Sequence, residues 1–446
     1  MSDKRSYGKE MLLIGVPITL QSIIQASYGL VDQFMVGRLG TVSIAGSGIG
    51  ATFSSLVIVT LSAIAAVASI LITQYYGSQN KQGIIQSFYA CFYVAMLVML
   101  VFVIPSLITP KQIIALYTTD FETIQMASRY LRIVVLSFFP MTISLLLSSL
   151  LRSLENSRPP MYASAVSMGS NVVFNYIFIF GKFGMPRLGL IGAGIGTLIA
   201  RSIEAILLIV FLLKKGYLYN ANFRLRGGNR FFYQKIAGMM IPILLNEFLW
   251  SLGENIYAII YGRIGIQSLA AVTLTNPMQS MFIGMFTGIS TAAAIMVGKR
   301  LGCDNKKEAY EVSIFILKVS FLGSVITSVL LILIAKPYVT LFRVEPEVAK
   351  MTKYLIYALA VVLCAKIMNM VLAGGIIRSG GNTRYTLFID LIGTWIFGVP
   401  LGIVAATILK LPVYQVYFIL SQEEVVRLVL GFLVFHKRKW MKNITK

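Results

Sequence analysis

The sequence predicts an all-α polytopic membrane protein with twelve transmembrane helices in two six-helix lobes. A pseudo-twofold axis along the membrane normal is expected to relate the two lobes. Three observations predict this fold: an apolar composition, a regular recurrence of long apolar stretches, and an internal duplication. The 446 residues are 57% hydrophobic and only 13% charged, whereas soluble domains carry roughly 25% charged residues.

Apolar stretches of roughly 20 residues or more, long enough to cross a bilayer, recur along the whole chain. In the first half we expect spans at 11–36, 45–75, 86–108, 125–150, 160–181 and 188–213. In the second half we expect spans at 236–261, 270–298, 310–335, 350–376, 386–408 and 413–435. These spans divide the chain into an N-lobe at 1–213, a basic cytoplasmic linker at 214–235 and a C-lobe at 236–446.

The second half repeats the first at an offset of 225 residues. The Gly-Arg-Leu-Gly of 37–40 falls on the Gly-Arg-Ile-Gly of 262–265, and after one inserted residue Arg152 falls on Arg378. Because each half has an even number of spans, both halves keep one orientation and the axis between them follows the membrane normal. A duplicated apolar chain of this kind predicts a transporter with its pathway between the lobes.

The net charge of +22 is explained by the membrane, because most lysines and arginines fall on the predicted cytoplasmic side. This asymmetry predicts a multi-pass protein of a bacterial plasma membrane with both termini in the cytoplasm. The linker at 214–235 is basic and contains no acid, so we expect it to rest against anionic headgroups. The bilayer therefore accounts for the basic residues, and no nucleic-acid partner is predicted.

Motifs for ATP use and for catalysis are absent from the sequence. No G-x-x-x-x-G-K-[ST] phosphate loop occurs. The single histidine, His436, lies in the C-terminal tail, and the three cysteines show neither a pairing nor a metal-ligand pattern. The sequence predicts neither an enzyme nor a cofactor, and an ion gradient acting on buried carboxylates remains as the energy source.

Polar residues within the first-half spans are candidates for a cation-binding site, because a charge in hydrocarbon costs about 2.5–3.5 kcal/mol. Asp32, near the outer end of the first span, can bind a proton or Na⁺, or pair with Arg38. Asn171 and Asn175 share a helix face at i,i+4 and offer carbonyl oxygens to a hard cation, or hydrogen-bond neighbouring helices. Thr197 on the sixth span adds a hydroxyl.

Four charged residues in the second half are candidates for binding substrate or a proton, namely Glu247, Glu254, Lys366 and Asp390. Glu247 and Glu254 lie two turns apart on one face of the seventh span. Glu254 is also about one turn from Tyr257, the repeat counterpart of Asp32. Lys366 can pair with either Asp390 or Glu254, and the sequence leaves both pairings open.

Two further groups of charges are interpreted as structural. Arg201 and Glu204 lie at i,i+3 on the sixth span, where they can neutralise each other. Glu423, Glu424 and Arg427 form a local charge cluster on the twelfth span.

Several motifs resemble the multidrug and toxic compound extrusion (MATE) family of cation-coupled efflux transporters. They are Pro17-x-x-Leu20-Gln21, Asp32-x-x-Met35-Val36-Gly37-Arg38-Leu39-Gly40, the run from Arg152 to Pro159, Asn171-x-x-x-Asn175, Leu188-Gly189-x-x-Gly192-Ala193 and the second-half echoes. The resemblance implies a Na⁺ or H⁺ site formed by Asp32, Asn171, Asn175 and Thr197. The chain departs from some branches at Asn175, where they have Asp, and from others at Lys366 and Asn369, where their tenth helix carries an acid.

The resemblance predicts a monomeric H⁺- or Na⁺-coupled antiporter that exports small cationic or amphipathic organic compounds by alternating access. A lipid-linked oligosaccharide flippase of the same superfamily is the alternative, although few cationic residues are available to hold pyrophosphate. A major-facilitator transporter shares the helix number but usually carries a basic Gly-Asp-Arg-type motif in the loop that here reads Gly-Ser-Gln-Asn-Lys at 77–81. The duplicated, evenly spaced halves argue against a channel or a receptor.

Overall fold

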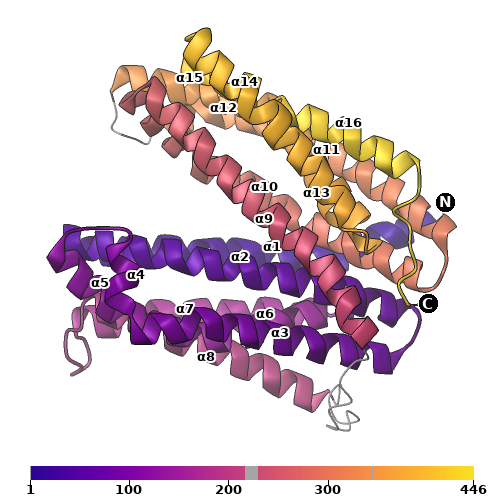
Figure 1. Ribbon diagram of the computed structural model, residues 1–446, viewed down its shortest axis with the longest axis horizontal. Coiled ribbons are helices and arrows are strands. Elements are labelled where there is room, and N and C mark those ends of the chain that lie inside the picture. The colour runs from indigo at the N-terminus through magenta and orange to yellow at the C-terminus, as the bar shows by residue number, and fades with distance from the viewer. Residues whose placement is uncertain (1, 216–229, 341, 343–344, 446) are drawn as a thin grey trace. The chain divides into compact units, whose positions relative to one another are not determined.

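The computed structural model describes residues 2–215, 230–340, 342 and 345–445. Regular structure in these residues is helical throughout, which confirms the predicted all-α class (Figure 1). The chain forms two compact units. We call Leu20–Ile236 the first-half unit, and Met1–Thr19 together with Ala237–Lys446 the second-half unit.

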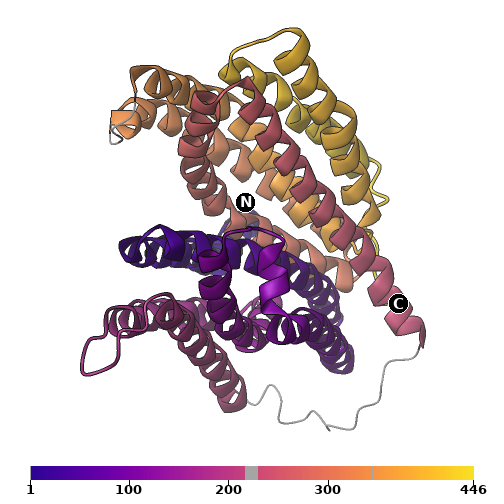
Figure 2. The same cartoon turned by 60° about the vertical axis from the view of Figure 1, so that its left-hand side comes forward.

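The first-half unit is built mainly from long helices, of which α7 and α8 lie side by side (Figures 1 and 2). Its elements are α1 (Ser2–Val36, from Leu20 onward), η1 (Gly37–Leu39), α2 (Thr41–Gly77), α3 (Lys81–Ile108), α4 (Pro110–Ala115), α5 (Phe121–Val134), η2 (Val135–Ser137), α6 (Phe138–Ser153), α7 (Arg158–Phe180) and α8 (Leu190–Lys214).

The second-half unit repeats this pattern with more irregular helices, and α11 and α12 pack together along their length. Besides α1 up to Thr19, its elements are α9 (Arg230–Ile264, from Ala237 onward), α10 (Ile266–Gly302), α11 (Lys306–Thr340), α12 (Pro346–Asn369), η3 (Met370–Ile377), α13 (Arg384–Leu391), η4 (Ile392–Gly398), α14 (Val399–Ile403), η5 (Val404–Ile408), α15 (Val413–Leu420) and α16 (Glu423–His436). Three of these, η3, η4 and η5, are π-helical.

Among the described residues, eleven helices are long and apolar enough to cross a membrane. The predicted twelfth span, 413–435, is divided between α15 and α16. A tight turn joins the two helices, because Gln422 N donates to Ile419 O at 3.1 Å and Glu424 N donates to Ser421 O at 3.1 Å. These i→i+3 bonds keep the backbone paired through the turn, so α15 and α16 together account for the expected span.

The backbone repeats the internal duplication at its sharp turns. Gly40 and Gly265 both have positive φ, as do Gln79 and Asp304 at the same offset of 225 residues. After each of the latter turns an asparagine caps the next helix. Asn80 accepts a hydrogen bond from Gly83 N at 2.8 Å, and Asn305 accepts one from Glu308 N at 3.2 Å. Such caps satisfy helix N–H groups that would otherwise lack a partner, so both halves begin their third helix in the same way.

The part of α1 up to Thr19 belongs to the second-half unit. Tyr7, Met11, Ile14 and Ile18 belong to the same buried cluster as side chains of α10, α11 and η3. The predicted N-lobe at 1–213 remains a prediction, since compactness groups its first residues with the second half. Of the predicted linker, 216–229 lie outside the described residues.

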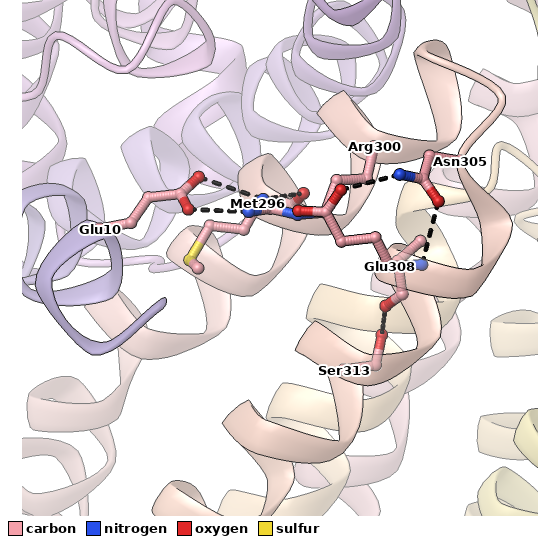
Figure 3. Close-up of polar contacts among 7 residues, drawn as sticks. Glu10, Met296, Arg300, Asn305, Glu308 and Ser313 are labelled. Atoms are coloured by element: carbon pink, nitrogen blue, oxygen red, sulfur yellow. Dashed lines mark hydrogen bonds and ion pairs between the residues drawn. The ribbon is translucent and has the colours of Figure 1, made fainter. Parts of the chain in front are cut away.

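An ion-pair network fixes the start of α1 on α10 and α11 (Figure 3). Arg300 donates to both carboxylate oxygens of Glu10, at 3.1 and 2.9 Å, and to Glu308 Oε1 at 2.7 Å. Its guanidinium also lies over the Tyr7 ring, 5.3 Å from the centroid. A two-pronged guanidinium–carboxylate contact is both directional and strong, so Arg300 holds two segments that are far apart in the sequence.

Candidate functional site

Asp32 lies in a buried polar cluster of the first-half unit. It is a half-buried residue of α1, whereas Asn171 and Asn175 on α7 are fully buried. Asn175 Nδ2 donates to Asp32 Oδ1 at 2.5 Å and to Asn171 Oδ1 at 3.2 Å. The structure therefore brings three of the sequence-predicted residues together, and the amide of Asn175 is the group that joins them.

Close packing of α7 against α8 positions Asn175. A Cβ added at Gly196 would lie 2.1 Å from Asn175 Oδ1, so only glycine leaves room for the amide against the α8 backbone. Asn175 Oδ1 is buried and has no hydrogen-bond partner among the described residues. An unpaired buried carbonyl costs free energy, and this oxygen is an acceptor that a bound cation could use.

Thr197 follows Gly196 on α8, and its hydroxyl donates to Ala193 O of its own helix at 3.0 Å. The threonine oxygen keeps a lone pair for a further interaction. The alternative pairing of Asp32 with Arg38 is not found among the described residues, where Arg38 instead lies over the Phe34 ring at 5.0 Å. Carboxylate, amide and hydroxyl oxygens are the ligands that hard cations prefer, so the residues present fit a Na⁺ ion as well as a proton.

A second polar chain runs from α6 to α8 through α1 and α7. Arg152 donates to Gln21 Oε1 at 2.8 Å, Gln21 Nε2 donates to Ser164 Oγ at 2.9 Å, and Ser164 Oγ donates to Glu204 Oε1 at 2.6 Å. The other oxygen of Glu204 pairs with Arg201 at 3.1 Å. The expected Arg201–Glu204 pair is thus confirmed, and it forms one end of a longer network that contains one acid, Glu204, and two arginines, Arg152 and Arg201.

Arg201 and Tyr28 link this chain to the helix of Asp32. Tyr28 lies one turn before Asp32 on α1, and its hydroxyl hydrogen-bonds Ser167 Oγ, which in turn donates to Ala200 O at 2.7 Å. The Arg201 guanidinium lies over the Tyr28 ring, 4.8 Å from its centroid. Cation–π contact of this kind holds the arginine on the same face of α1 as Asp32.

In the second-half unit, the candidates on α9 have different surroundings. Glu247 pairs with Arg378 at 3.6 Å, an interaction between the seventh and tenth predicted spans. Glu254 is exposed on the same helix. Because Arg378 is the repeat counterpart of Arg152, the arginine at the end of each half's fourth span contacts the first helix of that half.

Neither pairing proposed for Lys366 is found among the described residues. Lys366 Nζ lies 3.6 Å from Glu424 Oε1, and Asp390 instead pairs with Arg427 at 3.6 Å. The expectation was wrong because the interpretation treated Glu424 as part of a cluster local to one helix. Packing of α12 against α16 brings Lys366 and Glu424 together.

The charges on α16 form the centre of a cluster that extends over several helices. Arg427 lies 3.3 Å from Glu423 Oε1 and 3.7 Å from Glu424 Oε1. Glu423 also accepts a hydrogen bond from Tyr257 of α9, and Glu424 accepts one from Asn369 Nδ2 at 2.8 Å. All three α16 side chains are buried. The predicted local charge cluster is therefore confirmed by the contacts of Arg427 with both glutamates, and the structure extends it to α9 and α12.

Sequence reasoning missed Gln21, Ser164 and Arg152 as members of the first-half network. The signal was present in part, since Arg152 occurs in a motif that the two halves share and Gln21 occurs in one of the motifs that resemble the MATE family. A neutral Gln or Ser in an apolar span carries no charge penalty that would single it out. Only the contacts reveal that these residues connect to the buried acid Glu204.

Comparisons with known proteins find similar sequences along both halves of the chain. A sequence model of the MatE family matches residues 17–177 and 242–404, one segment in each half. The chain is 23% identical over 439 residues to a probable multidrug resistance protein NorM of Thermotoga maritima, covering 98% of this chain and 93% of the relative. It is 23% identical over 402 residues to the multidrug resistance protein MdtK of Yersinia pseudotuberculosis, covering 88% and 86%.

Solved structures share the fold at low sequence identity. The Vibrio cholerae MATE transporter VcmN in its bent form superposes with a TM-score of 0.90 at 16% identity, covering 98% of both chains. An outward-facing multidrug resistance MATE family transporter gives a TM-score of 0.88 at 19% identity, covering 97% of this chain and 96% of that one. With matching segments in both halves and a shared fold over nearly its whole length, the chain belongs to the MatE family of membrane transporters.

Proposed function

We propose that this protein is an H⁺- or Na⁺-coupled antiporter that exports cationic or amphipathic organic compounds by alternating access. The observation that carries the proposal is the buried contact of Asp32 with Asn175, next to an amide oxygen without a partner. A carboxylate in such surroundings has two states, ionised and neutralised by a cation, that make different hydrogen bonds. The names of the NorM and MdtK relatives support small organic molecules as substrates.

Coupling follows from the hydrogen bond that cation binding changes. A proton or Na⁺ at Asp32 competes with the Asn175 N–H for the same carboxylate oxygen, so the α7–α8 contact at Gly196 responds to the ion. An ion can shift a conformational equilibrium only by its differential affinity for the two states, typically by about 1–3 kcal/mol. The antiport cycle therefore needs this hydrogen bond to form in one state and to be replaced in the other.

Helix α1 is suited to pass such a change along the chain. It supplies Asp32 to the first-half unit and its residues up to Thr19 to the second-half unit. Pro17 lies inside the helix, two residues before that boundary, and proline removes one backbone hydrogen bond and favours bending there. Ion binding at Asp32 is thereby coupled through one helix to both compact units.

Substrate recognition is proposed for the acids of the second half. Glu254 is exposed on α9 near the exposed apolar side chains of Trp250 and Leu252, a combination that suits an amphipathic cation. Glu247, Lys366 and Asp390 take part in ion pairs and are proposed to set the local charge. We place the protein in a bacterial plasma membrane as a monomer with both termini in the cytoplasm.

Dye transport into vesicles containing the purified protein tests the proposal, with Na⁺ and pH gradients imposed separately. Transport driven by one gradient and lost in Asp32→Asn is expected. Asp120→Asn is the matched control, because Asp120 caps α5 outside the spans through Thr123 N at 2.8 Å and asparagine caps a helix equally well. Full transport by Asp32→Asn would reject Asp32 as the coupling site.

A folded protein that transports no cationic dye under either gradient would reject antiport. Lipid-linked oligosaccharides would then be the substrates to test, as expected for a flippase. Arg201 and Arg427 argue against that reading, since both are paired with glutamates and offer little free charge to pyrophosphate.

A further inference from the structure

Glu423 and Tyr257 form a buried acid–hydroxyl pair in the second-half unit. The Tyr257 hydroxyl donates to Glu423 Oε2, and both residues are about 95% buried. Gly398 of η4 packs directly on the pair, since a Cβ there would lie 2.3 Å from both Glu423 Oε2 and the Tyr257 hydroxyl oxygen. π-Helical segments such as η4 often occur at functional sites. The backbone at Gly398 therefore lies so close to this pair that only a residue without a side chain fits there.

The duplication relates this pair to the site around Asp32. Tyr257 is the counterpart of Asp32 at the offset of 225 residues. The offset of 226 that relates Arg152 to Arg378 also relates Thr197 to Glu423. The carboxylate of the second half thus lies on the last helix of its repeat, and the first helix supplies a hydroxyl in place of the acid.

Contacts support this correspondence. Ser167 of α7 reaches the α8 backbone at Ala200. Its counterpart Gly393, again at an offset of 226, packs on the α16 side chain of Arg427, with a Cβ position 2.4 Å from Arg427 Cγ. Arg427 is itself the counterpart of Arg201. The same pair of helices in each half therefore meets at the same level and carries an arginine next to a buried acid.

The charges around Glu423 do not balance when all acids are ionised. Asp390, Glu423 and Glu424 supply three negative charges, and Lys366 and Arg427 supply two positive ones. The titratable and charged groups that face Glu423 are Tyr257 and Tyr261 on α9, Lys366 on α12, and Glu424 and Arg427 on α16. Asp390 on α13 joins the cluster through Arg427, and Glu254 on α9 and Tyr417 on α15 join it through Lys366. An uncompensated buried charge is strongly unfavourable, and one bound proton removes it.

Hydrogen bonding selects Glu423 as the acid that takes this proton. Glu424 contacts both Lys366 and Arg427 and accepts from Asn369 Nδ2, so its charge is well compensated. Glu423 and Asp390 each have Arg427 as their one cation, but the Asp390 side chain is 25% exposed and that of Glu423 only 5%. Glu423 is therefore the acid whose charge is least solvated, and Tyr257 is its hydrogen-bond partner. A tyrosine hydroxyl can donate to a carboxylate or accept from a carboxylic acid, so the pair stays hydrogen-bonded in both protonation states.

The surroundings of Glu423 suit a proton better than a metal ion. Its partners are an N–H donor of Arg427 and an O–H donor of Tyr257, whereas Na⁺ needs several oxygen acceptors. The described residues contain no group of three or more His, Cys, Asp or Glu side chains arranged to hold a metal. The close approach of Gly398 also leaves no space for a coordinated ion.

We infer that Glu423, held by Tyr257, is a second proton-binding site of this transporter, separate from Asp32 and located on the last helix of the second repeat. The inference rests on the proposed antiport, to which it adds a coupling proton. In the cycle, Glu423 takes one proton to form a neutral acid that donates to Tyr257, and returns that proton when the pair separates. The inference assigns a proton, and no metal ion, to the second half.

Infrared difference spectroscopy of the purified full-length protein tests the site without relying on transport. As the pH is lowered, protonated carboxyl groups add a carbonyl-stretch signal. Glu423→Gln is expected to lose a titrating signal that the wild type retains, while Asp32→Asn loses a different one. Glu347→Gln, which removes an exposed acid outside the cluster, is the matched control. It should keep the buried-acid signal of the wild type and lose only the contribution of one surface acid. An unchanged buried-acid signal in Glu423→Gln would overturn the inference.

Tyr257→Phe provides a second variant if Glu423→Gln does not fold. It keeps the carboxyl group and the aromatic ring but removes the hydroxyl, so the Glu423 signal should shift in frequency. A signal with unchanged frequency and pH dependence would overturn the pairing. Because these readouts do not need substrate, failure of the Glu423 site and failure of antiport are distinguished.

Transport then measures what the site contributes. In vesicles, the pH gradient that just balances an opposing substrate gradient gives the ratio of protons to substrate. Glu423→Gln is expected to lower this ratio by one proton relative to the wild type and Glu347→Gln. An unchanged ratio would mean that Glu423 takes no part in coupling.

Discussion

Gly196→Ala is the substitution that most directly tests the geometry of the Asp32 site. The added Cβ would lie 2.1 Å from Asn175 Oδ1 and 3.1 Å from both Asn175 Cγ and Asn175 N. Neither the amide nor the α7 backbone can stay in place at these distances. The variant should therefore separate α7 from α8 locally and move Asn175 away from Asp32.

Two costs follow from this displacement. Overpacking a close helix–helix contact destabilises a protein by roughly 1–3 kcal/mol. Loss of the hydrogen bond from Asn175 to the Asp32 carboxylate adds about 1.5–3 kcal/mol if the charge stays buried. Alanine recovers some of this, since it favours a helix over glycine by roughly 0.5–1 kcal/mol. We expect a net loss of about 2–4 kcal/mol.

Gly169→Ala is the matched control on the neighbouring helix. Gly169 lies on the same helix as Asn171 and Asn175, and a Cβ there meets nothing within 4 Å. This variant should be neutral or slightly stabilised through helix propensity alone. Both variants change one hydrogen to a methyl group, so the comparison isolates the contact at Gly196.

Thermal unfolding of the purified variants measures the stability difference, and gradient-driven dye transport measures coupling. Gly196→Ala should unfold at a clearly lower temperature than Gly169→Ala and should lose ion-dependent transport. If the two variants unfold at the same temperature and transport equally well, the α7–α8 contact does not position Asn175, and the reasoning about the site fails.

Two further predictions concern the second-half unit. The first is a double-mutant cycle of Glu10→Gln and Arg300→Met, measured by thermal unfolding. We expect a coupling energy of about 1 kcal/mol, because the ion pair is two-pronged but partly exposed. Additive effects of the two substitutions would show that Glu10 and Arg300 do not interact in solution. Trp440→Ala should cost roughly 3–5 kcal/mol, because the indole is fully buried and stacks on Phe435 at a centroid distance of 5.7 Å. Lys439→Ala, which truncates the exposed neighbour, should leave the unfolding temperature unchanged, and an equal effect of both changes would contradict the packing of the tail.

Much of the first-half site could be predicted because its members are exceptional in an apolar span. Asp32 is a charge in hydrocarbon, and the i,i+4 spacing of Asn171 and Asn175 places both amides on one helix face. In the structure the two asparagines contact each other, and Asn175 also contacts Asp32, as this spacing predicts. Gln21 and Ser164 were not predicted, since their role depends on Arg152, which lies 131 residues from Gln21 in the chain.

The partners of the second-half charges could not be predicted for the same reason. The sequence left Lys366 with two possible partners, Asp390 and Glu254, whereas its pairing with Glu424 depends on how α12 and α16 are rotated against each other. Tyr257 meets Glu423 across 166 residues of sequence. No periodicity along one helix contains this information.

The sequence by itself determined the all-α membrane class, the duplication and the polar residues that are candidates for the site, because hydropathy and repeat offsets can be read from the order of residues alone. Tertiary structure decided which charges neutralise each other, which unit holds the first nineteen residues, and how closely glycines bring helices together. The physical reason is that a buried charge is stabilised by whichever partner packing places within a few ångströms, and that distance is set by the rotation and depth of whole helices.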